Sequence, residues 1–410
     1  MNIAEIGLIV GLDWADCEHV CCLREPTAAT GQVVRIGTAP EAFGPWLDSL
    51  RQQHDHGLIA VVLERPNGSV VEMIQDRAGF VVVAVNPATL HRFRQAFVPS
   101  GAKDDPGDAA LLAELLVRHP EKMKHLLPAD PQVRLLDTLT HQRRHLVEQR
   151  TKLIQQLTHL LKDYFPQALE LAGSNLSAPL AVEFLRRWPE LGSLKRSRWA
   201  SVERFYRQHR CGRPAVLGQR RDLIAQAVPV STDTSYLKLC RLQMETLVAQ
   251  LVALTPLIER YDQEIAGTYA QVPGRAVIDS LPGAGPAMAP RLWVACAQAG
   301  AAPTAMDLAQ ISGIAPVQRQ SGKSRQVCFR RARPHFLHQS WREFALHSIA
   351  GSFWAHHFYH SRAKAGQGRN AILRALAFKW TRIVARLWRD QLPYDETFYL
   401  AHLKTRPSAT

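Results

Sequence analysis

Residues 7–13 read Gly-Leu-Ile-Val-Gly-Leu-Asp, an unbroken apolar run that ends in a carboxylate. A run of this length and composition is typical of a strand buried on both faces of a sheet. Residues 58–64, Leu-Ile-Ala-Val-Val-Leu-Glu, repeat the pattern and also end in an acid. The sequence therefore predicts two fully buried strands, each followed by a carboxylate.

Further elements are expected on either side of the second run. Pro and Gly turns separate the predicted strands, and apolar spacing indicates the helices. The strands are His19–Leu23, Gln32–Ile36 and Phe80–Val85, and the helices are Pro40–Gln53 and Val70–Arg77. The order β-β-β-α-β-α-β predicts an α/β domain with a mixed sheet, of ribonuclease H-like type.

Four carboxylates are candidates for a metal site. Asp13 and Glu64 end adjacent predicted strands, and a buried carboxylate is unfavourable unless it binds a positive group. Asp105 and Asp108 open an amphipathic helix that runs to about Arg118, and their spacing places them on one face. Together the four would hold two divalent metals of the kind that serve phosphodiester chemistry.

A structural interpretation of the same residues stays open. Asp105 precedes Pro106 and suits a helix N-cap, with Asp108 at the third helical position. Asp13 and Glu64 would then be ordinary polar residues at strand ends.

The middle of the chain carries two long amphipathic patterns. Pro131–Lys162 and Ser235–Ile265 each predict one helix, and residues 170–233 between them predict a small helical insertion. The two helices would form an antiparallel pair, an intermolecular coiled coil, or both. The apolar positions of the second are Leu239, Leu242, Leu247, Leu251, Leu254 and Ile258.

Positive charge is concentrated in the basic stretch, Leu308–Arg389. It holds 15 Lys and Arg against a single acid, Glu343, whereas the rest of the chain balances at 35 basic and 35 acidic residues. A solvated surface normally mixes both signs. A face this basic instead predicts a nucleic-acid partner, because each neutralised phosphate releases counterions. We expect the cations of a helix at Ala371–Trp388, Lys379 among them, to face phosphates.

Ser321 lies in the loop Gln318–Arg325, surrounded by cations. A serine hydroxyl needs a base for its proton and cations for the developing phosphorane charge, and no neighbour in the sequence is a base. The residues alone favour a phosphate-contacting serine, with Ser324 as a rival. The cations expected to contact nucleic acid here are Arg319, Lys323, Arg325, Arg330, Arg331 and Arg333.

Ser280–Ala289 reads Ser-Leu-Pro-Gly-Ala-Gly-Pro-Ala-Met-Ala, which is typical of a helix-hairpin-helix. Gly283 and Gly285 would permit the tight turn, and the amides of the next helix would face a DNA phosphate. A plain structural turn is the alternative.

The composition excludes other classes. No apolar run has membrane-spanning length, and the N-terminus lacks the basic start of a signal peptide. The seven cysteines contain no CxxC pair, which favours a reducing cytosol over disulfides or a zinc module. His356, His357 and His360 have helical spacing but no acidic or cysteine partner, so we do not expect a zinc site.

In their order, these motifs resemble transposases of the insertion sequence one-ten family, over nearly the whole chain. The N-terminal motifs are Gly11–Ala15, Leu63–Gly68 and Lys103–Ala109, and the C-terminal ones are Leu281–Pro286, Ile314–Gly322, Trp354-Ala, Leu373–Trp380, Pro393–Glu396 and Tyr399-Leu.

The resemblance implies a RuvC-like domain (1–130) whose acidic tetrad, here Asp13, Glu64, Asp105 and Asp108, binds Mg²⁺. It implies a helical middle (131–270) and a C-terminal serine transposase domain (271–403) in which Ser321 attacks DNA covalently. It also implies a composite site across subunits of a homo-oligomer (dimer or tetramer), a structured guide RNA from the element, and a bacterial cytoplasmic, nucleoid-associated location.

Two departures from the family pattern bear on the site. Asp104 replaces a usual threonine and is a rival ligand to Asp105, and a single serine precedes Gly322, which favours Ser321. Two other functions remain. One is a metal-dependent nuclease resembling a Holliday-junction resolvase, without a covalent serine step. The other is a non-catalytic nucleic-acid-binding protein.

Overall fold

The computed structural model describes residues 3–64, 68–97, 104–123, 125–126, 130–322, 324–328, 330 and 333–405. The chain divides into two compact units, Met1–Ala129 and Asp130–Thr410, each considered by itself. Among the described residues, no helix combines the length and the apolar composition needed to cross a membrane.

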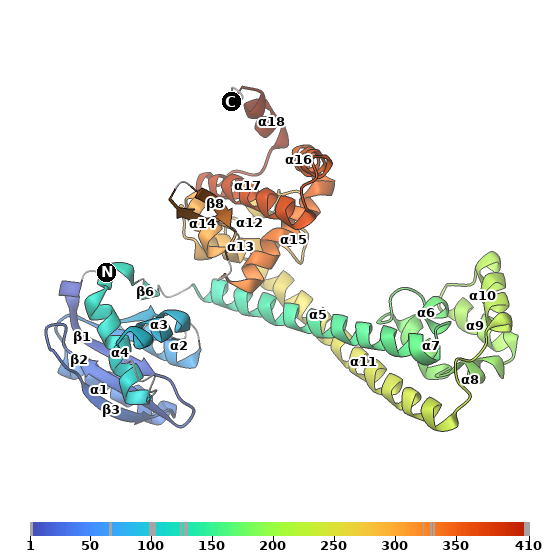
Figure 1. Cartoon of the computed structure of the whole chain (residues 1–410), viewed down its shortest axis with the longest axis horizontal. Coiled ribbons are helices and arrows are strands. Elements are labelled where there is room, and N and C mark those ends of the chain that lie inside the picture. Colours follow the sequence, from blue (N-terminus) through green and yellow to red (C-terminus); the bar gives the residue numbers. More distant parts are fainter. Residues whose placement is uncertain are drawn as a thin grey trace. The chain divides into compact units, whose positions relative to one another are not determined.

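The first unit is built on a six-stranded sheet in the order β3-β2-β1-β4-β5-β6 (Figure 1). The parallel strands β1, β4 and β5 form its centre, and β2, β3 and β6 pair antiparallel, so the sheet is mixed. The strands are β1 (Ile6–Asp13), β2 (Glu18–Arg24), β3 (Gln32–Gly37), β4 (Leu58–Leu63), β5 (Phe80–Ala84) and β6 (His125–Leu126).

Helices cover both faces of this sheet. Leu8 and Val10 of β1 pack with α1 (Pro40–Gln53) and α2 (Ser69–Gln75), whereas Ile9 packs with α3 (Pro87–Phe97) and α4 (Asp105–Arg118). Burial on both faces explains why β1 and β4 read as continuous apolar runs. The predicted α/β domain with a mixed sheet is confirmed and fits the RuvC-like type. The sequence did not indicate α3 or β6.

Two long helices organise the second unit. The helices α5 (Pro131–Tyr164) and α11 (Thr234–Ala270) pack along each other (Figure 1). Arg143, near the start of α5, pairs with Asp262, near the end of α11, and its Nη2 lies 3.1 Å from Oδ2. The pair is therefore antiparallel within one chain, and a coiled coil between chains stays a prediction.

Five short helices lie between the two long ones in the sequence. They share a core with the end of α5 and the start of α11. Leu239 and Leu242 of α11, expected on its packing face, are instead 53% and 62% exposed. The five are α6 (Ala168–Leu171), α7 (Pro179–Arg187), α8 (Leu191–Lys195), α9 (Trp199–Gln208) and α10 (Pro214–Gln226).

The remaining elements surround a separate core at the start of α5 and the end of α11, centred on Trp341 and Trp380. This part is mainly helical, as predicted, with one β-hairpin. The elements are α12 (Arg275–Asp279), α13 (Ala289–Gln298), α14 (Ala305–Ile311), β7 (Val317–Ser321), β8 (Ser324–Cys328), α15 (His335–Gly351), α16 (Phe353–Lys364), α17 (Arg369–Asp390) and α18 (Glu396–Thr405).

Several residues of the C-terminal motifs hold this core together. The indole of Trp380 donates to Ser348 Oγ at 2.8 Å, and that of Trp354 donates to Tyr394 Oη at 2.7 Å. Glu396 Oε1 accepts from Ser352 Oγ at 2.8 Å, where Ser352 is the N-cap of α16. Buried polar groups need such partners, so these motif residues have a packing role in this chain.

Candidate functional site

The two strand-end carboxylates lie side by side in the sheet. In the parallel pairing of β1 with β4, Leu12 is in register with Leu63, so the next residues are Asp13 and Glu64. Both are half-buried. Because they end adjacent parallel strands, they project from the same edge of the sheet.

Helix α4 is brought to that edge by a glycine. A Cβ on Gly11 would lie 1.9 Å from the carbonyl oxygen of Ala109 and 2.8 Å from the amide nitrogen of Ala113. Only a residue without a side chain allows this contact between strand and helix. Asp108, which precedes Ala109, is therefore held near the end of β1.

Asp108 has a cationic partner that the sequence analysis missed. Arg94 of α3 donates from Nε to Asp108 Oδ1 at 2.7 Å, and its Nη2 contacts the same oxygen. The two side chains are 13% and 6% exposed, respectively. Leu90, Phe93 and Phe97 stand at helical spacing and could have indicated α3, but nothing in the sequence pairs Arg94 with Asp108.

The remaining acids lie at the start of α4. The N-cap is Asp104, which makes no side-chain capping bond, and Asp105 is the first helical residue and is exposed. The alternative that made Asp105 the N-cap is therefore wrong. Over the part of the chain that the structure describes, no three His, Cys, Asp or Glu side chains gather closely enough to hold a metal. The acidic set (Asp13, Glu64, Asp105 and Asp108) is thus near one sheet edge but not assembled as a ligand shell.

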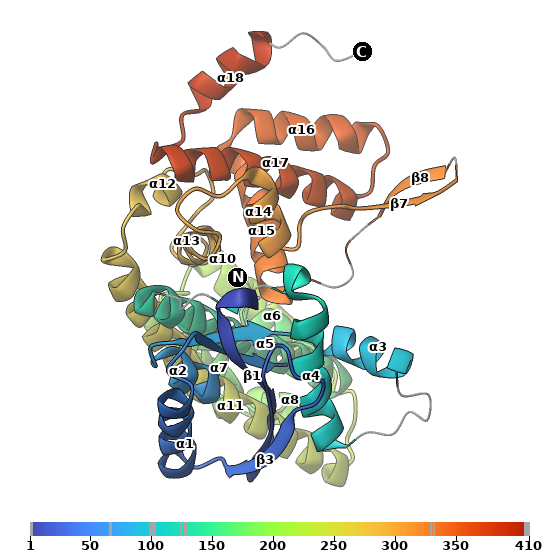
Figure 2. The same cartoon turned by 90° about the vertical axis from the view of Figure 1, so that its left-hand side faces the viewer.

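Ser321 lies at the tip of a β-hairpin. It is the last residue of β7 and pairs with Ser324, the first residue of β8, across a turn in which Gly322 has φ +56°. Figure 2 shows the hairpin projecting from the helices of its unit. Ser321 is exposed. An exposed hydroxyl on a two-stranded ribbon is accessible to a large substrate.

The cations predicted around Ser321 are only partly described. Lys323 and Arg331 lie outside the described residues, as do the side chains of Arg319 and Arg325. Arg330 Nε lies 3.5 Å from the Ala315 carbonyl oxygen, and Arg333 Nη1 donates to the Arg330 carbonyl at 3.0 Å. These two guanidinium groups are therefore anchored to the backbone beside the hairpin.

Lys379 has an aromatic environment. Its Nζ lies 4.4 Å from the ring centroid of Phe358 and 5.8 Å from that of Trp354. Burial, reinforced by Arg362 and Arg382, lowers the pKa of this amine. Its contact with nucleic acid stays a prediction.

The predicted helix-hairpin-helix turn joins α12 to α13. Gly283 has φ +85°, and a Cβ there would lie 2.7 Å from the backbone of His347 in α15. Gly285 has no atom that such a Cβ would meet. The amides of Met288 and Ala289 both donate to the Gly285 carbonyl, so they are already satisfied. The turn thus has a structural role, and a DNA contact at Gly283 and Gly285 stays a prediction.

The single acid of the basic stretch is neutralised from outside it. Glu343 Oε1 lies 3.1 Å from Arg144 Nη1, and Glu343 Oε2 lies 3.2 Å from Arg291 Nη1. Arg291 is buried, and burial lowers the pKa of its guanidinium. Glu343 is thus paired with two arginines from outside the basic stretch, and at the end of the stretch Arg386 and Arg389 pair with Asp390 just beyond it.

Two matches relate the sequence to known families. Residues 10–166 match a family described as "Transposase", and residues 275–360 match the "Transposase IS116/IS110/IS902 family". The first covers the acidic set, and the second covers Ser321 with the hairpin and α15.

Curated relatives agree with these matches. The chain is 32% identical over 206 residues to the "Putative transposase y4uE" of Sinorhizobium fredii, covering 50% of this chain and 57% of that protein. It is 25% identical over 406 residues to the "Mini-circle putative transposase for IS117" of Streptomyces coelicolor, covering 95% and 96%. A 28% identical match over 254 residues, 59% of each chain, is the "Insertion element IS116 uncharacterized 44.8 kDa protein" of Streptomyces clavuligerus. The two family matches cover residues 10–166 and 275–360, and the IS117 relative aligns over 95% of the chain. The chain therefore belongs to the IS116/IS110/IS902 family of transposases.

Proposed function

We propose that the chain exchanges DNA strands at the ends of an insertion sequence, and that Ser321 is the nucleophile. The observation that carries this proposal is the exposed position of Ser321 at the tip of a hairpin within the basic stretch. Its family membership supports the DNA substrate. The excess of positive charge supports binding of the phosphate backbone.

In the proposed step, Ser321 Oγ attacks a backbone phosphorus. The Oγ–phosphorus bond forms as the bond from phosphorus to one sugar oxygen breaks, which leaves a phosphoserine link to DNA. A carboxylate base accepts the hydroxyl proton, and the departing oxygen receives a proton. Arg330 and Arg333, anchored beside the hairpin, would stabilise the phosphorane charge.

Magnesium is part of the proposal, held by the acidic set. Carboxylate oxygens are its preferred ligands, and Asp13 and Glu64 already end adjacent strands. When bound, the ion would lower the pKa of a coordinated hydroxyl and neutralise phosphate charge. Asp108 would join the ligands once its carboxylate leaves Arg94.

A guide RNA and self-association complete the proposal. The basic stretch would accept RNA as well as DNA, because both offer phosphates. For self-association, Tyr236, Leu239 and Leu242 are exposed apolar side chains spaced by three residues at the start of α11. Such a stripe favours a second copy of the chain over solvent. Leu242→Glu should lower the mass measured by light scattering, and an unchanged mass would exclude this face.

The test of the serine step is a search for a covalent adduct. The protein is incubated with DNA that carries the element's ends, denatured, digested, and examined by mass spectrometry for a nucleotide on Ser321. We expect an adduct that Ser321→Ala and Asp13→Ala remove and Ser324→Ala keeps.

Other outcomes assign the chemistry differently. An adduct lost only in Ser324→Ala would move the nucleophile across the hairpin. DNA cleavage without any adduct, unchanged in Ser321→Ala, would favour the metal-dependent nuclease.

A further inference from the structure

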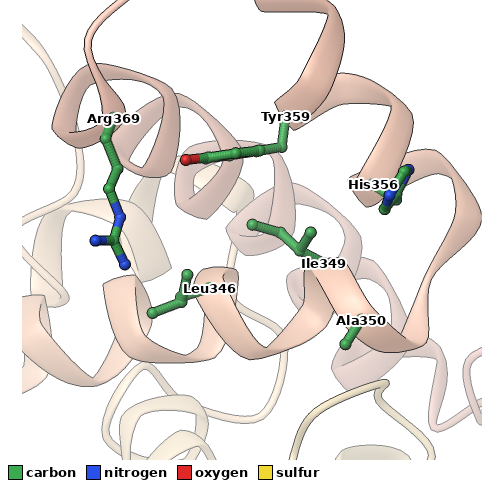
Figure 3. Close-up of a pocket in the computed structure, with 6 residues that line it drawn as sticks. All are labelled: Leu346, Ile349, Ala350, His356, Tyr359 and Arg369. Atoms are coloured by element: carbon green, nitrogen blue, oxygen red, sulfur yellow. The ribbon is translucent and has the colours of Figure 1, made fainter. Parts of the chain in front are cut away.

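A pocket of about 510 Å³ lies at the surface of the C-terminal helices, and none of its lining residues belongs to the Ser321 hairpin. Its walls come from α15, α16 and the first residue of α17 (Figure 3). The lining residues are Leu346, Ile349, Ala350, His356, Tyr359 and Arg369. The pocket is a shallow depression, widely open to solvent.

The lining combines three kinds of surface. Figure 3 shows the Tyr359 ring above Ile349 and Leu346, with its hydroxyl directed toward the side of the pocket that carries Arg369. A flat group placed here would contact an aromatic face above, aliphatic side chains below and a guanidinium at one end. That combination suits a nucleobase joined to a phosphate, since every base has a π-face and polar edges.

Further arginines gather at the Arg369 end. Arg342 lies one turn before Leu346 on α15, and its Nη2 donates to Asn370 Oδ1 at 2.6 Å. Burial lowers the pKa of Arg342, and the positive charges of Arg374, Arg333 and Arg369 lower it further. Guanidinium groups held this close repel one another, so an anion bound among them would be stabilised.

Glu343 relieves this repulsion only in part. Glu343 is the acid that favours the charged form of Arg342, but its two oxygens already contact Arg144 and Arg291. A backbone phosphate bound at this end would therefore be stabilised by the positive charge of these arginines.

We propose that this pocket holds an unpaired nucleotide of single-stranded DNA, with the base under Tyr359 and its phosphate against Arg342 and Arg369. The choice of DNA as the partner rests on the proposed function, because strand exchange exposes unpaired bases. None of the residues that line the pocket lies on the hairpin that carries Ser321, so its proposed role is to position a strand.

The test measures binding of a labelled oligothymidylate to the full-length protein by fluorescence anisotropy. Stacking of one base predicts that Tyr359→Ala weakens binding by about 5- to 150-fold. Tyr359→Phe, which keeps the ring, should bind within about twofold of the parent, since the ring supplies the stacking. Ala350→Phe should weaken binding by filling the pocket from its exposed rim.

Two controls separate the pocket from general charge. His357→Ala, on the exposed side of α16 outside the pocket, should leave oligothymidylate binding unchanged. Arg369→Gln should reduce the slope of log affinity against log salt by about 0.7, the value for one phosphate of a single strand.

Several outcomes would overturn the proposal. The first is unchanged oligothymidylate binding in both Tyr359→Ala and Ala350→Phe. The second is that these variants lose affinity for a blunt DNA duplex as much as for oligothymidylate. The third is that they lose affinity only for oligouridylate RNA. The proposed function has a separate test, the Ser321 adduct, and the absence of that adduct would contradict it. Tyr359→Phe should leave the formation of the adduct unchanged.

Discussion

Replacing Arg94 by glutamine should destabilise the first unit strongly. Arg94 and Asp108 form a nearly buried ion pair, with side chains 13% and 6% exposed. The variant would leave the Asp108 carboxylate buried without its cation. Removing one partner of a buried ion pair costs about 3–5 kcal/mol. We therefore expect the free energy of unfolding of this unit to fall by that amount.

Hydrogen exchange of the full-length chain measures this loss locally. Peptides from β4 are suited to it because Ile59–Val62 are fully buried at the centre of the sheet. A loss of 3 kcal/mol corresponds to about 160-fold faster exchange when opening is limited by unfolding of the unit. The matched control is Arg92→Gln, an exposed arginine on the same helix, which should change stability by less than about 0.5 kcal/mol.

Two further variants test the electrostatic reason. Arg94→Leu combined with Asp108→Leu should recover most of the stability, because no charge is left buried. Magnesium should slow exchange more in Arg94→Gln than in the parent, since the cation takes the place of the guanidinium at Asp108. A loss below about 1 kcal/mol in Arg94→Gln would show that the pair contributes little, contrary to the cost expected for a buried pair. An equal effect of magnesium on both proteins would refute the idea that Arg94 occupies a metal-binding carboxylate.

Three other predictions follow from single contacts. Gly11→Ala places a Cβ against the backbone of α4 and should cost about 1–3 kcal/mol in urea unfolding, unless the helix shifts. Gly283→Ala should cost at least about 1 kcal/mol, because of its positive φ and its contact with α15, whereas Gly285→Ala, with open space, should be neutral; equal effects would contradict this account. The pKa of buried His338 is lowered to about 4 by burial and by nearby arginines, so its neutral form is favoured in the folded state. Its contribution to stability is complete above about pH 6.5 and should be lost by roughly 1.4 kcal/mol per unit as the pH falls toward 4. His338→Gln should remove this slope from hydrogen exchange of α15, and an unchanged slope would assign it to other groups.

Much of the first unit could be predicted from local patterns. The runs at 7–13 and 58–64 are buried strands because both faces of the sheet are covered, and burial on both faces requires continuous apolar sequence. The helix at Pro40–Gln53 was predicted with the bounds that the structure gives. Helix α3 was missed although Leu90, Phe93 and Phe97 recur at helical spacing, because three apolar positions in a short polar segment make a weak periodic signal.

The candidate site was predictable only in its residue types. The apolar runs place Asp13 and Glu64 at strand ends, because a buried strand is recognisable from a few consecutive residues. The basic stretch is recognisable because net charge is obtained by counting residues along the sequence. The sequence by itself therefore determined the fold class and the family, and it proposed the four acids and the serine as site residues, which stay predictions.

Only the tertiary structure decided which groups meet. Arg94 reaches Asp108 from another helix, Glu343 is neutralised by Arg144 and Arg291, and Tyr359 and Arg369 line one pocket from two helices. Each contact joins residues that are 10 or more positions apart, and local propensity contains no information about such pairs. The packing of the helices sets the geometry of these pairs. Close approach of two helices and burial of a charged side chain together determine which partner that side chain has.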